Sequence, residues 1–415
     1  MAFDAASSEP AGGASRVWST SLLLLLASAI NYMDRQTLAN TSVRITREFG
    51  MSEEQYGNLE AGFGWAFAAG SLFFGFMADR AKLRWLYAAV LLLWSAMGFA
   101  SGFVRNYEQL LYCRTLLGFF EAGHWPCGIK TVRALLATDS RAMGNGVLQS
   151  GTSIGAIATP LVVSWLLTDE AGSWRLPFLA VGAVGALWAV AWVILAPPER
   201  LGAQAAPAGD RGQAWWRLLL DRRMAIIFAV VALINTTWQL LRAWLPKFLQ
   251  QGHGYEETYA LYYNSLWFAA TDVGCLGSGM LALWLARRGQ PVTRSRLIAF
   301  LLCALMCLAA VALPGLGQGW LLLAVLLIVG AGSLGVFPIY HAFTQDISHR
   351  HQGKITGISG LAAWAFSPLA QRLFGRHVDQ THSFDVGLAV AGCLPMIAWI
   401  LLAVAWPKQS HEEAD

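Results

Sequence analysis

The chain has 415 residues, of which 56% are hydrophobic and only 13% are charged, and its mean hydropathy is +0.47. Soluble domains contain about 25% charged residues, so the composition excludes a pair of water-soluble domains of this total length. It also excludes a disordered chain, a coiled coil and a small secreted domain held by disulfides. The formal net charge is +4, but the basic residues lie between apolar runs instead of forming one patch, which argues against a nucleic-acid partner.

The six cysteines all fall inside apolar runs, and their spacing is not that of a metal site or a redox pair. We therefore expect reduced thiols, no metal and no cofactor. Residues 1–16 are small and polar with one arginine, and the apolar run that follows is longer than the core of a signal peptide. We expect this run to remain as the first membrane span.

Twelve apolar runs have the length needed to cross a bilayer, about 20 residues. They are 17–39, 57–79, 85–104, 109–136, 141–168, 174–196, 224–249, 258–286, 296–314, 319–345, 353–376 and 384–406. The sequence therefore predicts an all-α polytopic membrane protein, with twelve transmembrane helices in two pseudo-symmetric six-helix bundles. The predicted parts are a tail (1–16), a first bundle (17–196), a polar linker (197–223), a second bundle (224–406) and a second tail (407–415).

The basic residues between the spans indicate how the chain is oriented. They concentrate in the segments that lie on the same side of the membrane as both termini, and the linker alone carries five arginines. Because cytoplasmic segments are enriched in Lys and Arg, both termini are predicted to be cytoplasmic.

The two halves also resemble each other in two pairs of segments, of which one joins 75–84 after the second span to 279–289 after the eighth. Residues 141–160 and 351–368 each follow a basic loop, contain several glycines and end on a proline. Small residues at such spacing let helices approach closely, so the pattern suits either plain helix packing or the movement of one bundle against the other.

Ionisable side chains inside the predicted spans are the strongest functional signal. Each costs at least a few kcal/mol in a bilayer, so it is expected to face the interior of the protein. The first span carries Asp34 and Arg35, whose side chains point about 100° apart on a helix and therefore serve different neighbours. The fourth span carries Arg114 and Glu121 on one face, about 10 Å apart along the axis, where one suits an anion and the other a proton.

Three further charges complete this set: Arg242 in the seventh span, Asp272 in the eighth and Lys130 in the fourth. The acids within the spans are three: Asp34, Glu121 and Asp272. The bases are four: Arg35, Arg114, Lys130 and Arg242. This surplus of positive charge predicts an anionic substrate. The alternative is that the charges only pair with one another and hold helices together. For Lys130, which can extend to the cytoplasmic surface, and for Asp272, a structural role is the favoured interpretation.

Uncharged residues supply weaker candidates. An aromatic cluster suits stacking on a sugar ring, although a belt at the bilayer surface is the commoner explanation: Trp238, Trp244, Tyr262, Tyr263 and Trp267. Polar residues within the spans suit either substrate hydroxyls or interhelical hydrogen bonds: Asn31, Gln149, Ser150, Ser153, Asn235, Gln239 and Asn264. His124 lies on nearly the same face as Glu121 and is interpreted as a hydrogen-bonded core histidine in preference to a proton relay.

Two motifs are fairly specific: the Asp-Arg pair of NYMDRQTLA (31–39) and the Arg-x6-Glu spacing of CRTLLGFFEAGHWP (113–126). Further matches are GFMADRAKLR (75–84), RAWLPKFL (242–249), DVG (272–274) and HQGKITG (351–357). Together they resemble the anion:cation symporter branch of the major facilitator superfamily over nearly the whole chain. That branch includes hexuronate and galactonate transporters and, more distantly, sialin and the vesicular glutamate transporters.

The resemblance implies roles for individual residues. Arg35 would contact the substrate carboxylate, and Asp34 would take part in proton coupling. Glu121 would be the main proton carrier, and Arg114 would tune it. Arg242 resembles the seventh-span arginine that meets the anion in the glutamate transporters.

The resemblance also implies a gate at the loop after the second span. Asp79 and Arg80 match the loop motif that latches the inner gate, and Arg84 belongs to the same segment. Two positions depart from the pattern. Lys82 replaces the usual glycine, and Phe67 replaces a tyrosine that touches substrate in related proteins, so sugar specificity is less secure than anion specificity.

These features predict a proton-coupled symporter that imports an organic anion, in particular a sugar acid such as a hexuronate or aldonate, by alternating access. A proton on Glu121 would release Arg114 while Arg35 and Arg242 bind the carboxylate. Further candidate substrate contacts are Tyr32, Trp238, Gln149, Asn264 and Gln239. The expected partners are the anion, protons and the lipids of a bacterial inner membrane, and the carrier is expected to be a monomer.

Two alternatives remain open from the sequence. One is an anion exporter or exchanger of the same fold. The other is a polytopic membrane enzyme, for which we find no HExxH, GxSxG or glycine-rich nucleotide motif.

Overall fold

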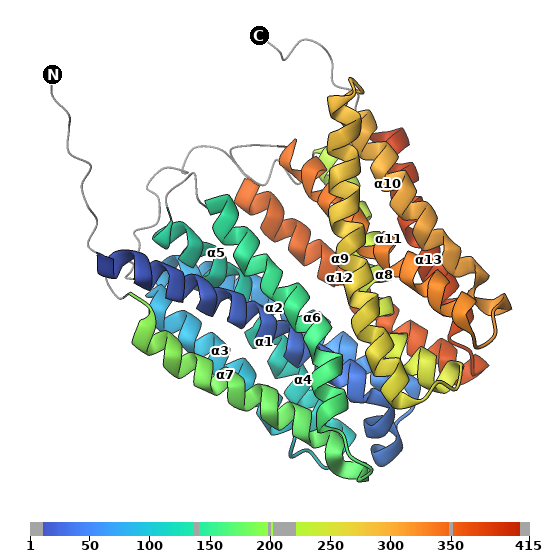
Figure 1. Cartoon of the computed structure of the whole chain (residues 1–415), viewed down its shortest axis with the longest axis horizontal. Coiled ribbons are helices and arrows are strands. Elements are labelled where there is room, and N and C mark those ends of the chain that lie inside the picture. The colour runs from blue at the N-terminus through green and yellow to red at the C-terminus, as the bar shows by residue number, and fades with distance from the viewer. Residues whose placement is uncertain (1–10, 137–140, 198–200, 202–220, 348–351, 407–415) are drawn as a thin grey trace.

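The protein consists of helices packed into two bundles (Figure 1). A computed structural model describes residues 11–136, 141–197, 201, 221–347 and 352–406. The first bundle contains α1 (Ala11–Phe49), α2 (Glu53–Arg80), α3 (Leu83–Ser101), α4 (Tyr107–Glu121), α5 (His124–Leu135), α6 (Arg141–Leu166), η1 (Ala171–Trp174) and α7 (Arg175–Leu195). The second contains α8 (Arg222–Lys247), η3 (Phe248–Gly252), α9 (Glu257–Arg287), α10 (Val292–Leu308), η4 (Ala309–Gly315), α11 (Trp320–Gln345), α12 (Gln352–Thr381) and α13 (Asp385–Ala405).

Nine helices within the described chain are long and apolar enough to cross a membrane. The other predicted spans, 17–39, 109–136 and 353–376, correspond to α1, to α4 with α5, and to α12. Charged and polar residues lower the hydropathy of α1 and α12, whereas α4 and α5, with 15 and 12 residues, are each too short to cross a membrane alone. Because α4 and α5 follow each other across a short break, the described helices provide twelve spans, and the predicted fold class is confirmed.

Most of the predicted tails and linker lie outside the described residues. These parts are 1–10 of the first tail, 198–200 and 202–220 of the linker, and 407–415 of the second tail. The helices on either side of the linker end at Leu195 and begin at Arg222.

Helix α1 is longer than the predicted span 17–39, since it continues to Phe49. Its last turns carry polar side chains that are buried against neighbouring helices instead of lying in a solvated loop, among them Asn40, Thr41 and Thr46. The helix ends before Gly50, whose φ of +60° is a conformation that glycine adopts without strain. Helix α2 then begins at a capping box formed by Ser52 and Gln55.

The fourth predicted span is divided into two helices. Helix α4 ends at Glu121 and α5 begins at His124. Pro126 lacks the N–H that would continue the α4 hydrogen-bond pattern to the carbonyl of Ala122, so the break lies where backbone geometry requires it. Glu121 is consequently the last residue of its helix, and it is fully buried.

The two bundles meet most extensively along three helix pairs: α2 with α12, α6 with α9, and α1 with α8. In Figure 1 they converge at the end opposite both termini, which we call the distal end, and diverge toward the end where the termini lie. Close approach at the distal end needs a small residue, because a Cβ atom at Gly57 of α2 would overlap the backbone carbonyl of Gln371 on α12. Glycine at this position therefore permits close contact between α2 and α12.

Charged residues join the bundles at the distal end. Arg44 on α1 donates two hydrogen bonds to the carboxylate of Glu257 on α9, at 2.6 and 2.9 Å. Lys247 at the end of α8 is buried and donates to Glu53 on α2 at 2.7 Å. The carboxylate of Asp379 on α12 accepts the backbone N–H groups of Glu53 and of the next residue, at 2.8 and 2.7 Å. The distal end is thus closed by contacts that must break if the bundles separate there.

Candidate functional site

The centre of the candidate site is an ion pair between α1 and α4. Arg35 donates from Nε and from Nη2 to the same oxygen, Oε2, of Glu121, at 3.1 and 2.9 Å. Arg35 is 5% exposed and Glu121 is fully buried. A charged pair at such depth keeps its charges only while each partner compensates the other, so a change in one alters what the other can bind.

Four aromatic rings surround the Arg35 guanidinium. Its central carbon lies 5.0–5.7 Å from the ring centres of Tyr32, Phe63, Phe67 and Trp364, distances at which cation–π attraction operates. Trp364 belongs to α12 of the second bundle, whereas the other three belong to the first. Arg35 therefore lies at the interface between the bundles. Sequence reasoning did not name Trp364 as a site residue, because an aromatic residue in an apolar run carries no signal of its own.

A second ion pair joins the two bundles directly. Arg242 on α8 donates from Nη2 to Oε2 of Glu60 on α2 at 2.6 Å, and both residues are at most 3% exposed. Arg114 on α4 lies on the other side of the same carboxylate, 3.5 Å from Oε1. Glu60 therefore stands between one arginine of each bundle.

Sequence reasoning missed Glu60, whose carboxylate lowers the expected surplus of positive charge. Glu60 falls inside the predicted span 57–79 but near its end, where a carboxylate is usually solvated at the membrane surface. The ion pairs of the network contain two buried carboxylates, Glu60 and Glu121, and three buried arginines, Arg35, Arg114 and Arg242. Arg35 and Arg242 are available to an anion only when Glu121 or Glu60 releases them.

The pairing also differs from the expected one. Arg114 and Glu121 were expected to act together because they share a face of one helix, but Glu121 bonds to Arg35 and Arg114 faces Glu60. Among the described residues, none of the three guanidinium nitrogens of Arg114 makes a hydrogen bond. Arg114 is therefore a fully buried cation whose bonding capacity is unused in this conformation.

Asp34 points away from this network, as its position next to Arg35 predicts. Its carboxylate lies against α3, where a Cβ atom at Gly98 would be 2.6 Å from Oδ1, and the residue is 2% exposed. Asp34 is thus a second buried carboxyl within the first bundle, separate from the interface.

The remaining candidate substrate residues are placed in different surroundings. Gln239 accepts a hydrogen bond from Nε of Arg242 at 2.8 Å and so belongs to the network. Asn264 on α9 donates to Asn40 on α1 at 2.8 Å, which links the bundles. Trp238 stacks on Trp267 with ring centres 5.6 Å apart.

Gln149 on α6 is exposed in this conformation, and its side chain donates within the helix to Thr152 at 3.3 Å. The structure therefore brings Gln239 to the arginines and leaves Gln149 apart from them. The aromatic cluster around Trp238 is mainly packing in the second bundle, since Trp244 and Trp267 are fully buried and both bond to neighbouring helices. Tyr262 points outward and is 57% exposed.

The candidate gating residues lie where α2 ends and α3 begins. Arg80 is exposed, and its guanidinium lies 6.0 Å from the ring centre of Phe76. Arg84 donates to the backbone carbonyl of Val193 on α7. The side chain of Asp79 is outside the described part of the structure, so the inner latch stays a prediction.

The residues interpreted as structural lie away from the arginines. His124 is hydrogen-bonded to Ser28 and to Tyr87, at 3.0 and 2.9 Å, and is fully buried. Asp272 on α9 accepts a hydrogen bond from Ser153 on α6 at 2.8 Å, again between the bundles. Lys130 is half-buried on α5.

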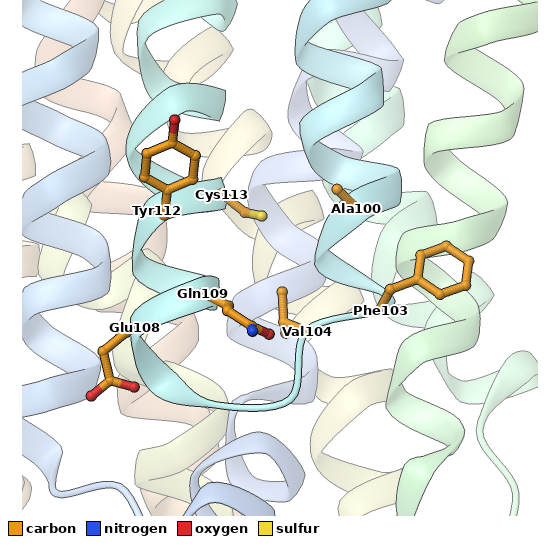
Figure 2. Close-up of a pocket in the computed structure, with 7 residues that line it drawn as sticks. All are labelled: Ala100, Phe103, Val104, Glu108, Gln109, Tyr112 and Cys113. Atoms are coloured by element: carbon orange, nitrogen blue, oxygen red, sulfur yellow. The ribbon is translucent and has the colours of Figure 1, made fainter.

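A surface pocket lies outside the network, at the distal ends of α3 and α4 (Figure 2). Its lining residues are Ala100, Phe103, Val104, Glu108, Gln109, Tyr112 and Cys113. Among these seven residues the only charge is the carboxylate of Glu108, so the pocket does not suit an anion. None of the candidate site residues lines it.

The comparison with known families identifies the fold. The family model of the Major Facilitator Superfamily matches residues 24–371. The chain belongs to this superfamily. It is therefore a membrane transporter and not an enzyme, as the sequence predicted.

Related transporters have been named in bacteria. The chain is 27% identical to the probable L-galactonate transporter of Escherichia coli K12, over 91% of this chain and 87% of that protein. It is 23% identical to the hexuronate transporter of the same organism, over 96% of both chains. These relatives confirm the resemblance to hexuronate and galactonate transporters.

Solved structures show the same architecture. A bacterial homologue of the human lysosomal transporter Spinster, in an inward-facing and occupied conformation, superposes with a TM-score of 0.74 over 93% of this chain and 96% of that chain, at 17% identity. A D-xylose–proton symporter superposes with a TM-score of 0.73 over 94% of this chain and 98% of that chain, at 16% identity.

Proposed function

We propose that this transporter imports a sugar acid, a hexuronate or an aldonate, together with protons. The names of its relatives, probable L-galactonate transporter and hexuronate transporter, support the substrate class. The buried arginines at the bundle interface support an anionic substrate, because guanidinium groups bind carboxylates through short, charge-assisted hydrogen bonds.

The ion pair between Arg35 and Glu121 is the observation that carries this proposal. A proton on Glu121 removes the negative charge that Arg35 bonds to, and an uncompensated buried guanidinium is unfavourable by several kcal/mol. A substrate carboxylate restores the compensation. Proton and anion therefore favour each other's binding, and a carrier that holds only one of them keeps an unpaired buried charge.

This mechanism revises the expected one in a single step. The proton on Glu121 releases Arg35 instead of Arg114, because Arg35 is the residue that bonds to Glu121. Asp34 is a second buried carboxyl of the first bundle and is the candidate for a second proton. If two protons enter with one monoanion, the membrane potential contributes about 2.3 kcal/mol per 100 mV to accumulation.

The positive-inside pattern assigns both termini to the cytoplasm of a bacterial inner membrane, so the distal end faces outward. The ion pairs of Arg44 with Glu257 and of Lys247 with Glu53 then form the outer gate. In this assignment the present conformation is closed to the outside, and substrate leaves toward the cytoplasm. Outward opening requires these pairs to break, which is the alternating-access step.

Uptake by purified protein in proteoliposomes tests the proposal. With an inside-alkaline pH gradient, labelled D-glucuronate or L-galactonate should accumulate above its external concentration, whereas the neutral sugar D-galactose should not. Collapse of the gradient with a protonophore should abolish accumulation. Extrusion of preloaded acid under the same gradient would instead indicate an exporter, and uptake unaffected by the protonophore would contradict proton coupling.

A further inference from the structure

Glu60 belongs to a row of contacts along one seam between α2 and α8. Glu53 bonds to Lys247, the hydroxyl of Tyr56 donates to the carbonyl of Ala243 at 2.7 Å, and Glu60 bonds to Arg242. Along this seam the residue numbers of the contacts rise on α2 and fall on α8, because the two helices are antiparallel. The pair of Glu60 with Arg242 is the innermost of the three, about 10 Å along α2 from the first.

The partners of this pair belong to different bundles, so the pair cannot survive separation of the distal ends. Both residues are buried, and an uncompensated charge at such depth is strongly unfavourable. Each residue therefore needs a new partner when the distal end opens.

Glu60 has such a partner within its own bundle. Arg114 already lies 3.5 Å from Oε1 of Glu60, and none of its guanidinium nitrogens is hydrogen-bonded to any residue of the described chain. Both residues move together because α2 and α4 pack against each other in the first bundle. A small movement of the carboxylate would exchange Arg242 for Arg114.

Among the described residues, Glu60 is the only carboxylate that forms an ion pair with Arg242, so Arg242 has no such alternative there. The carboxylate it loses is chemically the same group as that of a sugar acid. We propose that Glu60 is an internal competitor for the substrate at Arg242: it occupies this arginine while the distal end is closed and yields it to the substrate carboxylate when that end opens. This inference rests on the proposed function, since it takes Arg242 as a substrate contact.

Glu60→Gln tests the competition, because the amide keeps the size of the side chain and removes its charge. Binding of D-glucuronate to the purified protein should become about tenfold tighter by calorimetry. Arg242→Gln should weaken binding by at least as much. Unchanged or weaker binding by Glu60→Gln would overturn the proposal.

Glu53→Gln is the matched control on the same seam. It also removes one ion pair between the bundles but does not touch Arg242. If weaker contact between the distal ends were the only cause of tighter binding, Glu53→Gln and Glu60→Gln would raise the affinity for D-glucuronate equally. That result would contradict competition at Arg242. We expect Glu53→Gln to change the dissociation constant for D-glucuronate less than about threefold.

The double variant Glu60→Gln/Arg242→Gln separates competition from a general electrostatic effect. It leaves neither residue of the pair charged. If Glu60 acts through Arg242, the double variant should bind D-glucuronate with the same affinity as Arg242→Gln alone. Tighter binding in that background would show that Glu60 acts on the anion without Arg242 and would overturn the proposal. If Glu60→Gln alone fails to fold, Glu60→Asp takes its place, because a shorter carboxylate holds Arg242 less closely and should also tighten binding.

A measurement without substrate separates this inference from the proposed function. Spin labels at two exposed distal positions, Arg105 and Gln318, report the distance between the bundles in a cysteine-free background. In the empty protein, Glu60→Gln should increase the population with separated distal ends. An unchanged distance distribution would contradict the role of Glu60 in holding Arg242, whichever substrate is carried. If wild-type protein binds no sugar acid while the distances still shift, the proposed substrate is wrong and the Glu60 pairing stands.

Discussion

Arg35 on α1 directs two guanidinium nitrogens at one carboxylate oxygen of Glu121, the residue at which α4 ends. The other carboxylate oxygen, Oε1, has no hydrogen-bond partner among the described residues. A proton can therefore add to Glu121 at Oε1 without first displacing another donor. This geometry connects the protonation of Glu121 to the availability of Arg35 for a substrate carboxylate.

Glu121→Gln should abolish uptake driven by a pH gradient but spare exchange of internal for external substrate. The amide mimics the protonated acid, so the loaded carrier can still reorient, whereas a proton can no longer be released. The measurement compares gradient-driven uptake with counterflow in the same proteoliposomes. Loss of both activities in well-folded protein would count against a proton role. Glu108→Gln, at an exposed position on the same helix, is the control and should transport like wild type.

Arg35→Ala should remove binding of sugar acids without preventing insertion in the membrane. Truncating one partner of a buried charged pair costs about 2–5 kcal/mol in comparable interfaces, which corresponds to a loss of affinity of roughly 30-fold or more. Arg35→Lys keeps the charge but not the two-nitrogen geometry, and it should bind with intermediate affinity. Calorimetry with D-glucuronate measures both variants. Normal binding by Arg35→Ala would exclude Arg35 as the carboxylate contact.

Asp379→Ala should weaken closure of the distal end. This carboxylate accepts two backbone N–H groups at the start of α2 from the opposite bundle, and loss of a helix cap costs about 1 kcal/mol. A change of this size shifts a two-state equilibrium about fivefold toward separated ends. Spin-label distances between Arg105 and Gln318 report the shift. Asp169→Ala, at an exposed position of the first bundle, should leave the distances unchanged.

Gly57→Ala should prevent full closure of the same end. A methyl group at this position would overlap the backbone carbonyl of Gln371, and backbone cannot move aside as a flexible side chain can. We expect a larger separated population in the distance measurement and slower net uptake. Gly75→Ala is the matched control, because it lies on the same helix with open space around it. Equal effects of the two substitutions would indicate a general property of α2 and not contact between the bundles.

Much of the candidate site could be found from the sequence because each charge in an apolar run is a local signal. Arg35, Glu121, Arg114, Asp34 and Arg242 were named in this way, and all five are buried. Their partners could not be found, because pairing depends on which helices lie side by side. Spacing along α4 suggested that Arg114 acts with Glu121, yet in the structure Glu121 forms its ion pair with Arg35 of α1.

Glu60 shows the limit of local reasoning most clearly. In the sequence it stands close to the end of an apolar run, where a carboxylate is ordinarily exposed to water. It is buried only because α8 of the other bundle and α4 of its own bundle cover it, each with an arginine. Trp364 is a similar case, since only the packing of α12 on α2 brings its ring to Arg35.

The amino-acid sequence by itself determined the number of membrane spans, their division into two halves and the presence of buried charges. These follow from hydropathy and charge, which are properties of each segment alone. The tertiary structure alone decided which acid compensates which arginine, and that the closed distal end places Glu60 on Arg242. The reason is physical: the energy of a buried charge depends on the few ångströms to its counter-ion, and only the packing of helices distant in the chain sets that separation.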